Sequence, residues 1–333
     1  MNLKATHTAP ANIAFIKYWG ARNLEHAIPL NESISMTLSE CVSLSTVAFY
    51  DGSDEPDRID LVGEDGSLTI PSVAFRARAL AHLDRVRRWA KRGGSFRVAT
   101  RNSFPTGSGI ASSASGFAAL TLAATRSLGL SLTVDELSSL ARMSGSGSAA
   151  RSVMGGYVAW SVDGDLGHAT SVAPASHWDL RDVIALVDPG EKAVSSLEGH
   201  RLAPTSPHYS ARQRLLPARL EQVRRAIDRR DLDALGPILE EEAIELHLIA
   251  MSSKPPIFYW RPGTLGVLEA IRARRAQGLQ AWATMDAGAN VHVICPPSAE
   301  RDVAAVLQSL NGVVGVLLDG VGEGPAVQAE HLF

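Results

Sequence analysis

Residues 104–117 combine small side chains with the start of a helical pattern, in the order Phe-Pro-Thr-Gly-Ser-Gly-Ile-Ala-Ser-Ser-Ala-Ser-Gly-Phe. Gly107 and Gly109 let the backbone approach an anion closely. A helix that begins near Ser112 directs free N–H groups and a partial positive charge at the same point. The segment therefore predicts a phosphate cradle, with a purely structural turn as the alternative.

The predicted cradle matches neither of two common phosphate-binding motifs. It is not the P-loop, and Ser112 stands where a G-x-G-x-x-G fingerprint has its third glycine. Its hydroxyls suit phosphate oxygens or a phosphate-bound magnesium ion, for which Ser113 is the candidate ligand. The candidate nucleotide-binding residues are Thr106, Gly107, Ser108, Gly109, Ala111, Ser112, Ser113 and Ser115.

Segments of comparably unusual composition lie near both ends of the chain and between them. They are Ala-Asn-Ile-Ala-Phe-Ile-Lys-Tyr-Trp-Gly at 11–20, Ser-Gly-Ser-Gly-Ser-Ala-Ala-Arg-Ser at 144–152 and Met-Asp-Ala-Gly-Ala-Asn at 285–290. Val-Ser-Ser at 194–196 and Pro-Pro-Ile-Phe-Tyr-Trp at 255–260 lie between the last two. Together with the cradle, and in this order, they resemble the mevalonate diphosphate decarboxylase family of the GHMP small-molecule kinase superfamily.

The resemblance implies a reaction that uses ATP and Mg²⁺. Members of the family phosphorylate the tertiary 3-hydroxyl of a 5-phosphorylated mevalonate, after which phosphate and carbon dioxide leave and an isopentenyl product remains. A tertiary alcohol is a poor nucleophile, so a carboxylate must align it and accept its proton. Asp286 is the candidate, because it ends an expected strand and small residues follow it. Without the resemblance, an aspartate that caps a turn is the simpler interpretation.

The remaining candidate residues would hold the substrate. A guanidinium binds a carboxylate bidentately, so Arg151 is the candidate for the substrate carboxylate, and we expect Asn12 to assist it. Lys17 places a charge in an otherwise apolar strand, where it needs a partner such as an anion. The expected second cradle, for the 5-phosphate, consists of Lys17, Tyr18, Ser146, Ser148, Ser195 and Ser196.

Two departures from the family pattern bear on the substrate. Ala21 stands where diphosphate-using members usually have a lysine, and Leu197 stands where they often have an arginine or another polar residue. One charge-assisted contact contributes roughly 1.5–3 kcal/mol, so the loss of cations favours a monophosphate. We therefore expect 5-phosphomevalonate to be converted to isopentenyl phosphate. The alternative is 5-diphosphomevalonate giving isopentenyl diphosphate, with the missing charge replaced by Arg22, Arg76, His200 or Arg201.

Two other classes of function share parts of this pattern. A 3-kinase without decarboxylation would use the same cradle and aspartate, but the presence of Arg151 favours a decarboxylase. A catalytically inactive nucleotide-binding module would be expected to have lost Asp286 or the serine cradle, and the chain retains both.

The periodicity of apolar residues predicts the elements that position these segments. The first half contains strands within 1–50 and helices at 74–92, 110–128 and 134–143. The second half alternates strands near 180–188, 279–285, 290–295 and 312–319 with helices across 209–250, 261–277 and 298–310. The prediction is an α+β chain with a nucleotide-binding domain at 1–177 and a second domain at 178–333. The resemblance implies a GHMP-kinase-like fold, S5-like βαβ in the first domain and ferredoxin-like in the second.

The composition is typical of a globular enzyme. Of the 333 residues, 45% are hydrophobic and 20% charged, and the formal net charge is −3. These values argue against a disordered chain and against nucleic acid as a partner. The start of the chain has no apolar signal region and no run of about 18 apolar residues occurs, so we expect a cytoplasmic protein without membrane contact. Cys41 and Cys295 are expected in the core, and the resemblance implies a homodimer.

Overall fold

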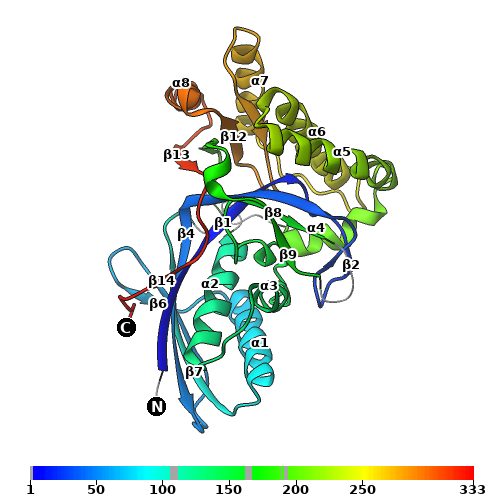
Figure 1. Ribbon diagram of the computed structural model, residues 1–333. Coiled ribbons are helices and arrows are strands. Elements are labelled where there is room, and N and C mark those ends of the chain that lie inside the picture. Colours follow the sequence, from blue (N-terminus) through cyan, green and yellow to red (C-terminus); the bar gives the residue numbers. More distant parts are fainter. Residues whose placement is uncertain (1–2, 106–111, 162–166, 189, 191–193) are drawn as a thin grey trace.

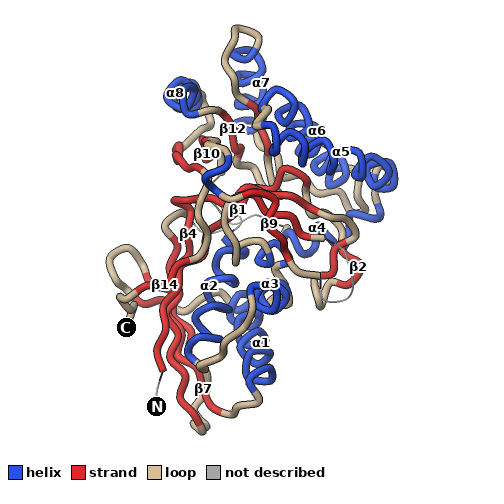
Figure 2. The backbone as a smooth tube through the Cα atoms, viewed as in Figure 1, coloured by secondary structure: helices blue, strands red, loops and turns tan. Residues whose placement is uncertain are grey.

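The protein consists of two β-sheets, each covered by helices (Figure 1; Figure 2). The computed structural model describes residues 3–105, 112–161, 167–188, 190 and 194–333. Within these residues the chain forms an eight-stranded sheet, a four-stranded sheet and a small two-stranded ribbon. The mixture of helices with antiparallel sheets confirms the predicted α+β class.

The larger sheet is built around two long strands. Its main path runs β14 (Ala326–Gln328), β1 (Leu3–Ile16), β4 (Ser33–Asp51), β7 (Gly94–Asn102), β5 (Arg58–Val62) and β6 (Leu68–Thr69). The first part of β4 also pairs with β8 (Tyr157–Trp160), which in turn pairs with β9 (Ala169–Ala173). Among these described strands, only β5 and β7 run parallel.

The pairing of β1 with β4 shifts register twice, between Pro10 and Asn12 and between Ala14 and Ile16. Such irregularities bend a strand and redirect its side chains, and they occur often beside active sites. Here they lie immediately before Asn12 and Lys17, two of the candidate site residues. The sheet therefore changes geometry where the predicted chemistry is located.

Three helices cover one face of the larger sheet (Figure 2). They are α1 (Val73–Ala90), α2 (Ser112–Ser127) and α3 (Val134–Arg142), followed by the short 3-10 helix η1 (Gly147–Ala150). Most side chains of α2 are buried, and its many small residues let it pack closely on β1 and β4. A capping box of Thr133 and Glu136 starts α3.

The smaller sheet carries the second half of the chain. Its antiparallel strands follow the order β11 (Trp282–Thr284), β12 (Val291–Cys295), β10 (Arg181–Leu186) and β13 (Gly315–Gly320). The α-helices of this half are α4 (Ser196–Leu202), α5 (Tyr209–Arg229), α6 (Leu232–Met251), α7 (Pro262–Arg275) and α8 (Glu300–Gln308). The remaining short elements are β2 (Ala21–Asn23), β3 (Ile28–Pro29), η2 (Ala175–His177), η3 (Ala203–Thr205) and η4 (Pro297–Ala299).

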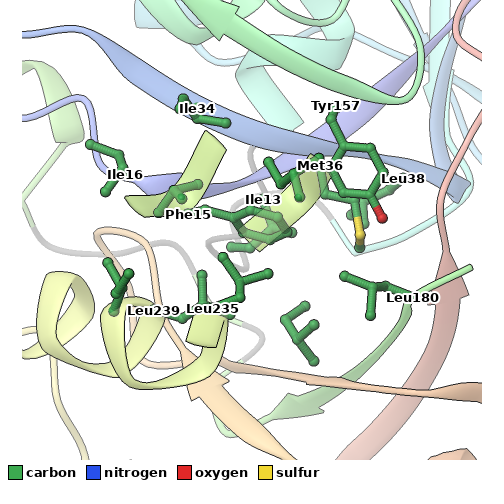
Figure 3. Close-up of a cluster of buried hydrophobic side chains, with 14 of the residues drawn as sticks. Ile13, Phe15, Ile16, Ile34, Met36, Leu38, Tyr157, Leu180, Leu235 and Leu239 are labelled. Carbon is green, nitrogen blue, oxygen red and sulfur yellow. The ribbon is translucent and has the colours of Figure 1, made fainter. Parts of the chain in front are cut away.

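An apolar cluster joins the two sheets (Figure 3). Ile13 of β1 and Met36 of β4 lie in one cluster with Leu235 and Leu239 of α6, and all four side chains are buried. Removing this surface from water is favourable in proportion to its area. The cluster therefore holds the end of β1 against α6.

Asp319 of β13 provides a polar link between the sheets. Its carboxylate accepts the backbone N–H groups of Ser39, Glu40 and Cys41 at 2.7, 2.9 and 2.8 Å, and the Ser39 hydroxyl at 2.9 Å. These N–H groups lie where β4 moves from Thr37, opposite Asn12, to Val42, opposite Pro10. The buried carboxylate thus binds backbone groups at the register shift.

Replacing Asp319 with alanine is expected to lower the free energy of unfolding by about 3 kcal/mol or more. The change leaves several buried N–H groups without an acceptor, and each such group costs about 1–3 kcal/mol. Urea unfolding followed by circular dichroism measures the difference. The control is Asp302→Ala on the exposed face of α8, for which we expect a change within about 0.5 kcal/mol. Equal stability of the two variants would contradict the assigned role of Asp319.

The structure differs from the predicted elements in several segments. The short elements β9 and η2, which precede the predicted start of the second domain at 178, and the short elements α4 and β14 were not predicted. Such short segments carry too few residues to show a period, and their pairing partners are distant in sequence. Cys41 and Cys295 are buried free cysteines, as predicted. None of the helices in the described part of the chain combines the length and apolar character needed to cross a membrane.

Candidate active site

Asp286 and Lys17 form an ion pair between the two halves of the chain. Asp286 lies shortly after β11, and Lys17 directly follows β1. Lys17 Nζ donates to Asp286 Oδ1 at 2.9 Å and to the Ala14 carbonyl oxygen at 2.6 Å. The Lys17 side chain is 1% exposed and that of Asp286 is 27% exposed. The carboxylate is thus the accessible member of the pair, supported by an ammonium group behind it.

The surroundings of Asp286 keep its carboxylate charged. Burial raises its pKa, but the charge and hydrogen bond of Lys17, together with the charges of His292 and Arg151, hold the pKa below its ordinary value. Burial lowers the pKa of Lys17, and the charge of Asp286 opposes that change. An ionised carboxylate in a partly open position is the group that a proton acceptor requires.

His247 of α6 supports the backbone of the same loop. Its Nε2 lies 3.1 Å from the Asp286 carbonyl oxygen, and its ring is buried against Tyr259 and Trp260. Burial lowers the pKa of His247 to about 3, assisted by the charge of Lys17. The imidazole is therefore neutral at pH 7 and donates its Nε2 proton to the carbonyl, which orients Asp286 without exchanging protons.

Arg151, which follows η1, is held by residues of the two long strands. Its Nε and Nη2 donate to Asn12 Oδ1 at 3.2 and 3.0 Å, and its Nη1 donates to the Ser33 hydroxyl. Burial lowers the pKa of Arg151 to about 10, and the charges of Asp286 and Tyr18 oppose this shift. The guanidinium therefore remains cationic at neutral pH. The structure brings Asn12 and Arg151 into contact and places Arg151 within electrostatic reach of Asp286.

Tyr18 forms an aromatic wall beside these groups. Its ring centroid lies 4.0 Å from that of His200 and 4.9 Å from that of Trp160. Burial raises the pKa of Tyr18 well above its ordinary value, against the charges of Arg142 and Arg151. The phenol is therefore protonated at neutral pH and available as a hydrogen-bond donor to an anion.

The structure argues against two of the proposed replacement cations. His200 Nδ1 accepts the Gly20 N–H at 3.0 Å, so that nitrogen carries no proton and the ring is neutral. Arg201 is bound at the surface by Glu198, with Nε 2.8 Å from Oε2. Arg22 and Arg76 have exposed side chains. None of the four residues proposed as replacements for the missing lysine is therefore a buried cation.

The start of α2 adjoins the loop that precedes η1. Ser113 Oγ lies 3.1 Å from Ser146 Oγ, so the predicted nucleotide cradle and the predicted substrate cradle meet at these hydroxyls. The first N–H groups of α2 begin at Ser112. A helix N-terminus lined by hydroxyl groups is suited to phosphate and to a phosphate-bound magnesium ion. The predicted residues Thr106, Gly107, Ser108, Gly109 and Ala111 lie outside the described residues.

The Ser115 hydroxyl is bonded within the fold. Its side chain is fully buried, and its hydroxyl lies 2.7 Å from Ser43 Oγ of β4 and donates to the Ser112 carbonyl oxygen at 3.3 Å. Helix geometry explains these contacts, because Ser115 faces the sheet on which α2 packs. Its contact with phosphate stays a prediction.

The other predicted phosphate ligands occupy different surroundings. Ser146 is buried and Ser148 half-buried, and the Ser148 carbonyl accepts the Asn12 amide at 3.4 Å. Ser195 is an exposed residue that caps α4 by accepting the Glu198 N–H at 3.2 Å, and Ser196 begins that helix. Lys17, predicted here as a phosphate ligand, contacts Asp286 instead. The predicted set is thus divided between the surroundings of Asp286 and Asn12 and the start of α4.

Two arginines that the sequence analysis missed lie near the site. Arg78 of α1 stacks on Phe117, and its Nε lies 3.6 Å from where a Cβ on Gly145 would be. That buried Nε has no hydrogen-bond partner among the described residues, which suits an anion held between α1, α2 and Ser146. Arg142, at the end of α3, is buried, donates to the His26 carbonyl and influences the pKa of Tyr18. Both arginines lie in amphipathic helices, where their sequence context is the same as that of solvent-exposed arginines, so no signal in the sequence distinguishes them.

Comparisons with known proteins show which family the chain is similar to. The family model "Diphosphomevalonate decarboxylase-like N-terminal domain" matches residues 9–173, and "Mevalonate 5-diphosphate decarboxylase C-terminal domain" matches residues 183–325. The diphosphomevalonate decarboxylase of Ganoderma lucidum is 33% identical over 362 residues, covering 96% of this chain and 89% of that protein. The human diphosphomevalonate decarboxylase is 35% identical over 306 residues, covering 86% of this chain and 75% of that protein.

Solved structures show the same fold. A complex of MDDEF with MVAPP, AMPPCP and magnesium is 34% identical, with a TM-score of 0.90 and coverage of 98% of this chain and 99% of that chain. The mevalonate diphosphate decarboxylase of Enterococcus faecalis is 33% identical, with a TM-score of 0.89 and the same two coverages, 98% and 99%. These similarities confirm the predicted two-domain, GHMP-kinase-like architecture.

The expected monophosphate substrate is wrong, because these relatives are named for a diphosphate substrate and a solved complex contains MVAPP. The prediction considered Arg22, Arg76, His200 and Arg201 as replacement cations but not Arg142, which the fold brings near Tyr18 from α3. The presence of Ala21 in place of the usual lysine therefore does not indicate a monophosphate substrate. With both family models matched along most of its length, the chain belongs to the mevalonate diphosphate decarboxylase family of ATP-dependent decarboxylases.

Proposed function

We propose that this protein converts 5-diphosphomevalonate and ATP to isopentenyl diphosphate, ADP, phosphate and carbon dioxide. The observation that carries the proposal is the partly exposed Asp286 carboxylate, bound to a buried Lys17 and lying within electrostatic reach of Arg151. This arrangement supports a proton acceptor and a carboxylate-binding cation acting at one site. The relatives named above supply the substrate class.

Asp286 acts on the 3-hydroxyl. Its ionised carboxylate aligns the hydroxyl and accepts its proton as the oxygen forms a bond to the γ-phosphorus of ATP. The bond between that phosphorus and the bridging oxygen of the β-phosphate breaks at the same time, and ADP is the leaving group. Lys17 holds that carboxylate in place through the 2.9 Å hydrogen bond. His247 binds the carbonyl oxygen of Asp286, so hydrogen bonds orient both the side chain and the backbone of Asp286. The phosphate placed on the 3-oxygen then becomes the leaving group.

Arg151 and Asn12 act on the substrate carboxylate. The bond between this carboxylate and C2 breaks, its electron pair forms the C2–C3 double bond, and the C3–O bond breaks to release phosphate. Arg151 holds the carboxylate until it departs, and Asn12 fixes the guanidinium through two hydrogen bonds to one oxygen. Once Asp286 has passed the proton to the departing phosphate, its regained negative charge stabilises the positive character that develops at C3.

ATP and magnesium would bind at the start of α2. The helix N-terminus and the hydroxyls of Ser112 and Ser113 would hold the phosphates, and magnesium would neutralise charge on the transferring group. Ser146 and Arg78 are available to a neighbouring phosphate. Tyr18, with Arg142 nearby, and the serines at the start of α4 are proposed to anchor the diphosphate.

A substrate panel tests the proposal. Mevalonate, its 5-phosphate and its 5-diphosphate are each supplied with ATP and magnesium, and ADP and carbon dioxide are measured separately. We expect equal amounts of both products, with kcat/KM for the diphosphate about 10–100-fold above that for the monophosphate, because one further charge-assisted contact contributes about 1.5–3 kcal/mol. Release of ADP without carbon dioxide would identify a 3-kinase and overturn the proposal.

Two expectations about the whole protein stay predictions. The homodimer is testable by light scattering of the purified chain, and the cytoplasmic location by fractionation of the cells that produce it. Neither is required by the proposed chemistry, because the residues discussed above all come from one chain.

A further inference from the structure

The backbone of Lys17 is held in an unusual way. Lys17 follows the last residue of β1, so its N–H and carbonyl groups lie beyond the strand ladder. The N–H donates to Glu242 Oε2 at 3.1 Å. The carbonyl accepts Arg212 Nη2 at 2.8 Å and Asn31 Nδ2 at 3.0 Å. Buried backbone groups require partners, and here two of the three partners are charged side chains from helices of the other half.

Those two side chains form a buried ion pair. Arg212 of α5 and Glu242 of α6 are 1% and 0% exposed, and Nη2 lies 2.7 Å from Oε2. Burial raises the pKa of Glu242, whereas Arg212, the Lys17 N–H and Arg219 lower it. The lowering effects are larger together, so the pKa of Glu242 is below its ordinary value. The Glu242 carboxylate is therefore ionised at neutral pH. Desolvation makes such a pair weak evidence for stability, so a different reason for its presence must be considered.

The contacts of the pair indicate that reason. Arg212 Nη2 bonds both Glu242 and the Lys17 carbonyl, and Glu242 Oε2 bonds both Arg212 and the Lys17 N–H. The two charges therefore bind the peptide groups on both sides of the Lys17 Cα. The side chain then extends from a fixed backbone to Ala14 and Asp286. The pair thus acts on Lys17, whose ammonium group contacts the candidate catalytic carboxylate.

We infer that the Arg212–Glu242 pair is a positioning device for the reaction, which fixes the Lys17 backbone so that its ammonium group stays on Asp286. This inference rests on the proposed function, because the Lys17–Asp286 contact matters for the reaction only if Asp286 is the proton acceptor. Arg212 and Glu242 touch neither substrate nor nucleotide in this assignment. They act through Lys17.

The charges that face the Lys17–Asp286 pair come from several elements. Arg151 follows η1, Glu242 and His247 lie on α6, and His292 lies on β12. Glu242 raises the pKa of Lys17 and Arg151 lowers it. Arg151 and His292 lower the pKa of Asp286. Removing the charge of Glu242 therefore acts on Lys17 both through its backbone and through space.

The test replaces Glu242 with glutamine, which has the same shape but no charge. Loss of the negative charge disfavours protonated Lys17, so its pKa is expected to fall by about one unit. A weaker Lys17 contact disfavours ionised Asp286, so the acidic limb of the kcat profile moves to higher pH while the basic limb moves to lower pH. We expect kcat at the optimum to fall about tenfold, since one pKa unit corresponds to a tenfold factor.

Two measurements separate this inference from the proposed function. The chain has five lysines, so nitrogen-detected NMR can follow the Lys17 ammonium in the ligand-free protein, with Lys17→Arg providing the assignment. This titration needs no substrate. An inactive wild-type enzyme would defeat the proposed substrate but leave the titration result standing. A Lys17 pKa that is unchanged in a folded Glu242→Gln variant would overturn the inference.

Glu245→Gln is the matched control. Glu245 lies one turn further along α6 and also binds Arg219, with Nη2 3.3 Å from Oε1, while Glu242 Oε1 accepts Arg219 Nη1 at 2.8 Å. We expect the control to keep the wild-type titration and pH profile. Equal shifts in both variants would show a general charge effect and overturn the inference. If Glu242→Gln does not fold, Glu242→Asp keeps the charge but withdraws it from the Lys17 N–H, and an unchanged kcat would then reject the assignment.

Discussion

Replacing Asp286 with asparagine is expected to lower kcat about 10³-fold, because the amide cannot accept the proton of the 3-hydroxyl. The side chain keeps its size and remains within hydrogen-bond distance of Lys17, so the local packing is preserved. Nucleotide affinity is expected to change little, since the cradle at α2 is a separate element. Steady-state rates of ADP release, together with the binding of a fluorescent ATP analogue, measure the two effects.

Asp188→Asn is the control for this variant. Asp188 lies after β10 and pairs with Arg261 at the surface, with Nε 3.3 Å from Oδ2. We expect this variant to retain wild-type kcat. An Asp286→Asn variant that keeps more than about a tenth of the activity would remove Asp286 from the role of general base, since such groups contribute about 10²–10⁴-fold.

Replacing Arg151 with lysine is expected to lower kcat/KM about 10²–10³-fold. Lysine keeps the positive charge but lacks the planar fork that binds a carboxylate bidentately and that Asn12 orients. Two charge-assisted hydrogen bonds, each worth about 1.5–3 kcal/mol, correspond to about 10²–10⁴-fold, and the positive charge that lysine retains recovers part of this loss. The measurement is the rate of carbon dioxide release as a function of substrate concentration, with ADP release followed in parallel.

Arg261→Lys serves as the control, because Arg261 is half-exposed and belongs to the surface pair with Asp188. Its kcat/KM is expected to match the wild type. Thermal unfolding of the Arg151→Lys variant must also be measured, since the arginine is buried and contacts Ser33. A folded Arg151→Lys enzyme with unchanged kcat/KM would show that the guanidinium does not bind the substrate carboxylate.

Both variants address a site that exists only between the two halves of the chain. Asp286 follows a strand of the smaller sheet, whereas Asn12 and Lys17 belong to or follow the first strand of the larger one. The apolar cluster around Ile13 and Leu239 and the polar contacts of Asp319 hold these sheets together. Changes at those contacts are therefore expected to affect activity through the geometry of the Lys17–Asp286 pair.

The sequence alone determined the residue types of the site and the class of chemistry. Glycines and serines before a helix predict an anion cradle from local geometry, and the structure shows Ser112 and Ser113 at the start of α2. The ordered segments around Asn12, Arg151 and Asp286 indicated a decarboxylase of this family. These inferences depend on short stretches of backbone and on chemical groups, which do not require knowledge of distant contacts.

Only the tertiary structure decided which groups meet. Lys17 and Asp286 are 269 residues apart in sequence, and Ser115 turned toward Ser43 because α2 packs its small-residue face on the sheet. Glu242 belongs to a run of three glutamates that has the pattern of a solvated helix face, yet it is fully buried on Arg212. Local sequence specifies the type and spacing of a side chain, whereas its direction and partner follow from long-range packing, because only that packing removes neighbouring groups from water.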